Sequence, residues 1–162
     1  MEEMSQLQRE IRQGKPFRSR GQEVVVALLR TADLVRRAVS QAVETHDITL
    51  QQYNVLRILR GAGDQGLPTL EIADRMIEHA PGVTRLLDRL EAKGLVRRER
   101  CRQDRRQVLC HATSEAGRLL ASLDGPMAAA AEQALSPLDR KGTQTLIGLL
   151  DAIRAERNRG SS

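Results

Sequence analysis

Aromatic residues are almost absent from this sequence. The 162-residue chain contains one Phe, one Tyr and no Trp. Proteins that bind single-stranded nucleic acid stack the bases on exposed aromatic side chains, so the composition argues against that mode of binding. A core without aromatic residues has to be built from Leu, Ile, Val and Ala, and such a core is typical of packed helices.

Cysteines and long apolar runs are scarce as well. Two cysteines in a chain of this length do not form a disulfide scaffold. No stretch reaches the roughly 18 uninterrupted apolar residues that a membrane span requires. The first residues, Met1 to Met4, include two acids and lack the apolar run of a signal peptide. We therefore expect a cytoplasmic protein without a membrane segment.

Signatures of catalysis are missing too. The sequence contains no glycine-rich phosphate loop, no pair of carboxylates at a useful spacing and no Ser/His/Asp arrangement. Cys101, Cys110 and His111 are possible metal ligands, but one hairpin supplies no fourth ligand to complete a zinc site. We therefore predict a protein that is not an enzyme and that holds neither a metal nor a cofactor.

Positive charge is present and is confined to one segment. The formal net charge of the chain is +5. Residues 93–106 contain seven cations and two acids, so this segment alone carries the whole excess. Its cations are Lys93, Arg97, Arg98, Arg100, Arg102, Arg105 and Arg106. Such a concentration of positive charge favours a polyanionic partner.

Apolar residues recur at three- and four-residue steps near both ends of the chain. We predict helices over residues 21–48 and 114–157, and we expect their apolar stripes to pack on a second copy of the chain as dimerisation helices. Residues 1–20 are polar and are broken by a glycine and a proline, so we expect a flexible arm there. We expect a frayed tail over residues 158–162.

The middle of the chain, residues 49–113, begins with signals for short helices. Thr49, with Gln52 three residues later, forms a capping-box pattern at the start of the first of them. A glycine-rich stretch then ends that helix. Thr69 is predicted to cap a brief helix that runs from Leu70 to Ile77 and packs its apolar side chains inward.

A further helix and a hairpin complete this middle part. The helix is predicted from a first turn at Pro81 to Lys93, and Gly94 ends it in a left-handed conformation. Residues 95–100 and 107–112 read as two short strands around a polar turn. Two helices joined by a tight connection and followed by a hairpin form a winged helix-turn-helix. We therefore predict a mainly α-helical fold with a small β-hairpin wing and with dimerisation helices at both ends.

The helix after Pro81 has one apolar face and one face suited to DNA. The apolar positions follow the i, i+3, i+4, i+7 pattern and are Val83, Leu86, Leu87 and Leu90. The opposite face carries Pro81, Arg85 and Asp88 and is flanked by Gly82, Thr84 and Arg89. The second helix of a helix-turn-helix enters the major groove, where an arginine such as Arg85 binds O6 and N7 of guanine. We therefore predict DNA contacts from Pro81, Gly82, Thr84, Arg85 and Arg89.

The hairpin turn supplies a second set of candidate DNA contacts. These are Arg102, Asp104, Arg105 and Arg106. Arginines at the tip of a hairpin enter the narrow minor groove, where the negative potential is strongest. An acid among them fits this role if its carboxylate orients an arginine through a charge-assisted hydrogen bond.

These motifs resemble the MarR family of winged helix-turn-helix repressors. The resemblance extends from about Gln22 to Ile153 and is most specific over residues 83–98 and at Asp104-Arg105-Arg106, which matches the family's Asp-x-Arg signature. It implies that Arg106 is the minor-groove arginine and that Asp104 is its buttress. It also implies that the residues facing the major groove are Pro81, Gly82, Thr84 and Arg85.

The same resemblance implies a homodimer whose interface is formed by the first helix and the last two helices. Members of the family bind palindromic operators in double-stranded DNA, and many are repressors released by a small, often phenolic, anion held between the dimer and DNA lobes. The sequence departs from the family at two places. His79-Ala80 stands where a serine often begins the recognition helix, and Cys110-His111 replaces an apolar strand ending.

Two alternatives remain open for a protein of this fold. A nucleoid-type protein would coat DNA through the same surfaces, without an effector and with little sequence preference. A redox-responsive regulator would use Cys101 and Cys110, which sit symmetrically about the hairpin turn and are placed to face each other across the strands. We favour two reduced thiols, because disulfides are rare in the cytosol.

Overall fold

The computed structural model describes residues 4–78, 82–101, 104 and 107–159. The chain divides into two compact units, residues 1–38 and 39–162, and each is described by itself. The division falls within one helix, α2 (Arg20–Glu44). Within the described ranges, no helix combines the length and the hydrophobicity that crossing a membrane requires.

The first unit consists of α1 (Gln6–Glu10) and most of α2. Ser5 caps α1, because its Oγ accepts a hydrogen bond from the backbone N of Gln8 while the Gln8 side chain accepts one from the backbone N of Ser5. The Gln8 amide also donates to the backbone O of Lys15 at 3.2 Å, which satisfies this buried polar side chain. The segment predicted as an arm therefore contains a short, capped helix.

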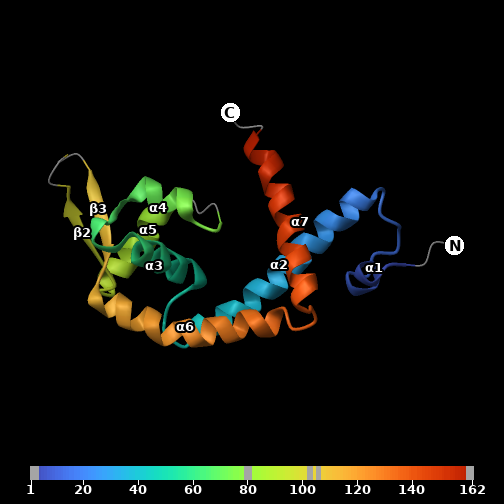
Figure 1. Cartoon of the computed structure of the whole chain (residues 1–162), viewed down its shortest axis with the longest axis horizontal. Helices are drawn as coiled ribbons and strands as arrows, with labels where there is room; N and C mark the ends of the chain where they lie inside the picture. The colour runs from blue at the N-terminus through green and yellow to red at the C-terminus, as the bar shows by residue number, and fades with distance from the viewer. Residues whose placement is uncertain (1–3, 79–81, 102–103, 105–106, 160–162) are drawn as a thin grey trace. The chain divides into compact units, whose positions relative to one another are not determined.

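The second unit combines helices with a small sheet (Figure 1). The helices are α3 (Leu50–Ala62), α4 (Thr69–Arg75), α5 (Val83–Ala92), α6 (Ser114–Ala134) and α7 (Arg140–Arg159), with a 3-10 turn at Gly63–Gln65. The strands are β1 (Leu67–Pro68), β2 (Val96–Arg100) and β3 (Val108–Ala112). The predicted mainly helical fold with a β-hairpin wing is confirmed. The last helix reaches Arg159, further than the predicted start of a frayed tail.

The starts of α3 and α4 test two cap predictions. Thr49 caps α3 as predicted, since its Oγ1 accepts from the backbone N of Gln52 at 3.2 Å and its own N donates to the Gln52 side chain at 3.0 Å. The predicted cap at Thr69 is wrong, because α4 begins at Thr69 itself and the extended residue before it is Pro68. The same helix ends at Arg75, and Leu70 is 79% exposed instead of packing inward.

The core of the second unit is almost entirely aliphatic, as the shortage of aromatic residues predicted, although it includes Tyr53. Its largest enclosed side chains come from α2, α3, α4, α5 and α6 and are Val43, Val55, Leu56, Leu59, Ile72, Leu87, Leu90, Leu120 and Leu123. Burying one such side chain contributes about 1.5–3 kcal/mol to folding. Because α5 supplies two of the leucines, the core fixes the inner face of that helix.

The central strand of the sheet is β3, which pairs antiparallel with β2 on one side and with β1 on the other. The β2–β3 hairpin was predicted, whereas the pairing of β1 with β3 was not. In that pairing Leu67 lies opposite Cys110 and Pro68 lies opposite Leu109. Proline is tolerated here because β1 is an edge strand whose outer side needs no donor.

The two cysteines do not face each other, which corrects their predicted symmetric placement. Cys110 lies opposite Arg98, whereas the backbone N of Cys101 donates to the backbone O of Gln107 at 2.9 Å. The hairpin turn is therefore not centred between the cysteines, and a strand register places each side chain according to its own partner. Both are free thiols; Cys110 is buried and Cys101 is half-buried.

Candidate nucleic-acid interface

The helix α5 has the two faces that the sequence predicted. Gly82 precedes it with φ 113° and ψ 25°, a left-handed conformation that favours glycine. Val83, Leu87 and Leu90 are buried, and Leu86 is half-buried. The core thus anchors this side and leaves the opposite side exposed.

Thr84, Arg85 and Arg89, three of the predicted contact residues, lie on the exposed side of α5. Within the described part of the chain, neither Arg85 nor Arg89 makes an ion pair or a side-chain hydrogen bond with another residue. Their guanidinium groups retain all their donors for a ligand. The prediction for Pro81 concerns a residue outside the described part.

Asp88, which also lies on the exposed side of α5, is bound by Arg98. The Arg98 guanidinium on β2 donates to Asp88 Oδ1 at 2.7 Å, to Glu91 Oε2 at 3.1 Å and to the backbone O of Thr84 at 3.4 Å. Burial lowers the pKa of Arg98, but hydrogen bonds with Asp88 and Cys110 and the nearby negative charges outweigh it, so the pKa is raised overall. Arg98 is therefore a fixed cation at the junction of α5 and the wing.

The wing extends from the body of the second unit as the β2–β3 hairpin (Figure 1). Three of its predicted contact residues, Arg102, Arg105 and Arg106, lie outside the described part, so their roles stay predictions. Asp104 is exposed, and its backbone O accepts a hydrogen bond from Gln107 at 2.9 Å. The predicted buttressing of Arg106 by Asp104 also stays a prediction.

Several cations of the basic segment are neutralised by acids within the structure. Lys93 Nζ lies 2.8 Å from Asp47 Oδ2, and Arg97 Nη1 lies 2.5 Å from Glu99 Oε2. Like Arg98, these cations have acidic partners within the protein. The charge that this segment offers to a polyanion is therefore smaller than the sequence count.

Cys110 and His111, which depart from the family that the sequence resembles, are both buried in the structure. His111 is 3% exposed, and its Nε2 lies 3.1 Å from Glu99 Oε1. Its imidazole ring lies against Gly66, where an added Cβ would come within 2.4 Å of Cε1. Among the described residues, no group of His, Cys, Asp and Glu side chains is arranged to hold a metal ion.

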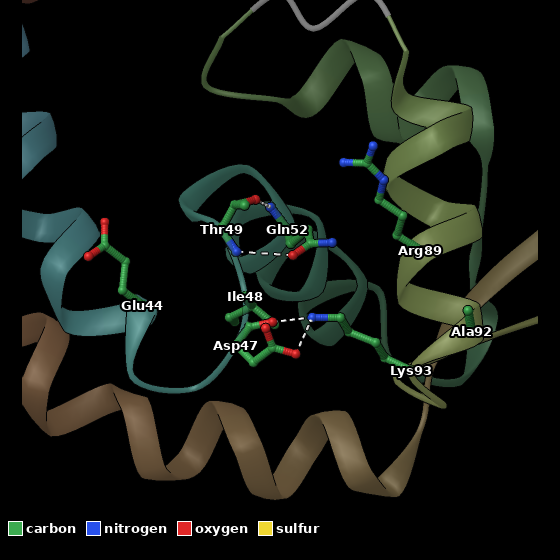
Figure 2. Close-up of a pocket in the computed structure, with 8 residues that line it drawn as sticks. All are labelled: Glu44, Asp47, Ile48, Thr49, Gln52, Arg89, Ala92 and Lys93. Atoms are coloured by element: carbon green, nitrogen blue, oxygen red, sulfur yellow. Dashed lines mark hydrogen bonds and ion pairs between the residues drawn. The ribbon is translucent and has the colours of Figure 1, made fainter.

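A pocket lies between the loop after α2, the start of α3 and the end of α5 (Figure 2). Its volume is about 510 Å³, and it is lined by Glu44, Asp47, Ile48, Thr49, Gln52, Arg89, Ala92 and Lys93. Figure 2 shows the Lys93 side chain reaching across to Asp47, whose backbone O and carboxylate both accept from Nζ. Asp47 is held in the left-handed region at φ 55°.

Sequence reasoning missed three features of this region. These are the engagement of Asp88 by Arg98, the approach of Gly66 to His111, and the third strand. The one signal in the sequence was the presence of two acids, Asp88 and Glu91, on a helix otherwise suited to DNA. Acids on a helix face that approaches DNA are expected to have a cationic partner, and Arg97 and Arg98 follow them in the sequence.

Comparisons with known proteins agree with this geometry. A family model described as "MarR family" matches residues 48–108. The HTH-type transcriptional regulator TtmR of Methylorubrum extorquens is 35% identical over 102 residues, which cover 63% of this chain and 51% of that protein. The chain spans about half the length of the curated relatives it matches.

Solved structures match over most of the chain. A MarR transcription factor from Planctomyces limnophilus is 36% identical, with a TM-score of 0.65, over 85% of this chain and 99% of that one. The S. aureus MepR–DNA complex contains a chain of the same fold that is 24% identical, with a TM-score of 0.72, over 80% of this chain and 96% of that one.

Proposed function

This chain belongs to the MarR family of winged helix-turn-helix transcriptional regulators, and on that premise we propose that it binds duplex DNA through α5 and the wing. The observation that carries the proposal is the outer face of α5, where Thr84, Arg85 and Arg89 are exposed while the inner face is locked into the core. A recognition helix needs this combination of a rigid back and free donors. The predicted absence of enzymatic activity agrees with the family and with the curated relatives, which are transcriptional regulators.

The proposed contacts divide between the two grooves. In the major groove Arg85 binds guanine and the start of α5 approaches phosphate, with contacts from Pro81, Gly82, Thr84 and Arg89. In the minor groove the wing contributes Arg102, Arg105 and Arg106, with Asp104 orienting an arginine. The MepR–DNA complex is a case of the same fold bound to DNA, which supports DNA binding and not the division between grooves.

The wing arginine provides a direct test. We expect Arg106→Ala to weaken DNA binding markedly, by about 1–3 kcal/mol, because an arginine in a narrow minor groove sits where the negative potential is strongest. A steep salt dependence should persist through the remaining cations. The measurement is a fluorescence-anisotropy titration at several salt concentrations. Unchanged affinity would remove the wing from the mechanism.

We also propose that the DNA-binding form is a homodimer. Apolar side chains on the predicted dimerisation helices are exposed in the single chain: on α2 these are Val24, Val25, Leu29 and Leu34, and on α7 they are Ile147, Leu149 and Ile153. Several exposed large apolar side chains on one helix are typical of a surface that pairs with another copy. We expect a dimer at micromolar concentration by sedimentation equilibrium; a monomer would contradict this.

A dimer dictates the form of the operator. Two copies of α5 related by a two-fold axis bind two half-sites about one helical turn, roughly 34 Å, apart, so the operator is palindromic. We propose that the protein acts as a repressor in the cytoplasm and that a small anionic effector releases it. The pocket of Figure 2 is the proposed effector site, because Arg89 offers an exposed cation and the pocket volume of about 510 Å³ suits a small molecule.

The decisive experiment selects genomic fragments bound by the protein and then titrates a selected palindrome and a random duplex of equal length. We expect the palindrome to bind at least about a thousandfold more tightly, as specific regulators do. We expect an aromatic acid such as salicylate to weaken only the specific complex. Equal affinity for both duplexes, unaltered by aromatic acids, would favour a DNA-coating protein instead.

A further inference from the structure

Arg98 differs from its neighbour on β2 in what surrounds it. Its side chain is 24% exposed, whereas that of Arg97 is 53% exposed and pairs within its own strand with Glu99. Successive side chains of a strand point to opposite faces, so adjacent arginines meet different environments. Arg98 points toward α5, where its guanidinium finds all the partners described above.

The acceptors that Arg98 binds form a row along α5. Thr84, Asp88 and Glu91 are spaced i, i+4 and i+7, so they lie on one side of the helix. A single guanidinium contacts the row with its Nη1 and Nη2 atoms, at 2.7, 3.1 and 3.4 Å. The contact therefore ties the recognition helix to the first strand of the wing.

The contact also changes the electrostatics of α5. Asp88 and Glu91 are the acids of this helix, and they offset the charge of Arg85 and Arg89. Carboxylates near a DNA backbone repel the phosphates, which reduces the affinity that cations supply. Arg98, on β2, offsets the negative charge of these two carboxylates.

We propose that Arg98 is a positioning residue for DNA recognition: it fixes α5 against the wing and neutralises the carboxylates of Asp88 and Glu91, and it does not itself contact DNA. This inference rests on the proposed function, because it assigns a role within DNA binding. It predicts that the importance of Arg98 depends on the presence of those two carboxylates.

A mutant cycle tests this dependence. Four full-length proteins are compared: the natural sequence, Arg98→Met, the isosteric pair Asp88→Asn with Glu91→Gln, and all three substitutions together. We expect Arg98→Met to weaken binding to a selected palindrome about tenfold, within the range of coupling in shared salt-bridge networks. In the protein that carries Asp88→Asn and Glu91→Gln, we expect Arg98→Met to weaken binding to the palindrome about twofold or less. An equal loss in both backgrounds, or no loss in either, would overturn the proposal.

Arg97→Met is the matched control, since it removes the same charge one residue away. Its effect should be the same whether or not the α5 carboxylates are present. If the effect of Arg97→Met depended on Asp88 and Glu91 as strongly as that of Arg98→Met, the cycle would report net charge alone. That result would overturn the proposal.

A readout without DNA separates this proposal from the proposed function. In urea unfolding of the same four proteins, we expect Arg98→Met to lower the midpoint more when Asp88 and Glu91 are present. If the natural protein bound no duplex, the proposed function and this role would both fall, whereas the unfolding cycle would still report the tie between α5 and β2. If the protein bound DNA and the unfolding effects were equal in both backgrounds, only the positioning role would fall.

Discussion

We expect Gly66→Ala to lower the free energy of unfolding by about 3 kcal/mol or more. Gly66 has φ 62° and ψ 179°, a backbone region that is essentially restricted to glycine, so holding an alanine there costs about 1–3 kcal/mol. An added Cβ would also lie 2.4 Å from Cε1 and 2.6 Å from Nε2 of His111. Forcing extra atoms into a packed site costs about 1–3 kcal/mol further.

Gly63→Ala is the matched control for this substitution. Gly63 has φ 58° and ψ −141°, so alanine meets comparable backbone strain there, but an added Cβ meets no described atom within 4 Å. The difference between the two variants in urea unfolding, at one protein concentration, isolates the contact with His111. We expect Gly66→Ala to be the less stable of the two.

A second substitution identifies the clashing partner. His111→Ala removes the imidazole ring that the new Cβ would meet. Gly66→Ala should therefore cost less stability in the His111→Ala background than in the natural sequence. The close packing of His111 on Gly66 would not contribute to stability if Gly66→Ala and Gly63→Ala were equally stable. The same would follow if Gly66→Ala cost the same free energy of unfolding with and without His111→Ala.

Arg85→Ala is expected to have the largest effect on sequence recognition. Arg85 is exposed on the first turn of α5, and within the described residues nothing competes for its guanidinium. A bidentate contact with guanine is worth about 1–3 kcal/mol of discrimination, so we expect roughly a ten- to hundredfold loss of affinity for the selected palindrome. Affinity for random duplex should fall much less, since only a point charge is lost there.

Two variants sharpen this test. Arg85→Lys keeps the charge but lacks the planar pair of donors, so it should retain non-specific binding and lose discrimination at one base pair. Arg118→Ala removes an arginine from α6 that pairs with Glu115, and it should leave recognition unchanged. Anisotropy titrations against the palindrome and its single-base variants measure both. If Arg85→Ala still distinguished the palindrome from its single-base variants as well as the natural protein does, recognition would belong to another residue.

The contrast between Arg85 and Arg98 shows how far residue type predicts role. Both are arginines of the same motif, and the sequence offers both as cations for DNA. The structure exposes one on the outer face of α5 and surrounds the other with acceptors. Whether a cation is available to a ligand depends on acids that the fold brings beside it, and for Arg98 those acids lie seven and ten residues earlier in the chain.

Features encoded within a few residues were predictable from the sequence. The Thr49 capping box, the left-handed Gly94, the apolar face of α5 and the β2–β3 hairpin all depend on neighbours less than about two helical turns or one tight turn away. Local hydrogen bonds and the 3.6-residue period act at this range in any fold. The error in the start of α4 was small for the same reason: the cap was predicted at Thr69, one residue after the observed cap at Pro68.

The amino-acid order alone thus established the helices other than α1, the wing and the exposed face of α5, because each follows from short-range periodicity and caps. Only the tertiary structure decided that β1 joins the sheet, that Cys101 and Cys110 lie out of register, that His111 packs on Gly66 and that Arg98 holds Asp88. The pairing of β1 with β3 and the packing of His111 on Gly66 bring together residues far apart along the chain. Their energies depend on which surfaces the core places in contact, and no local pattern encodes that choice.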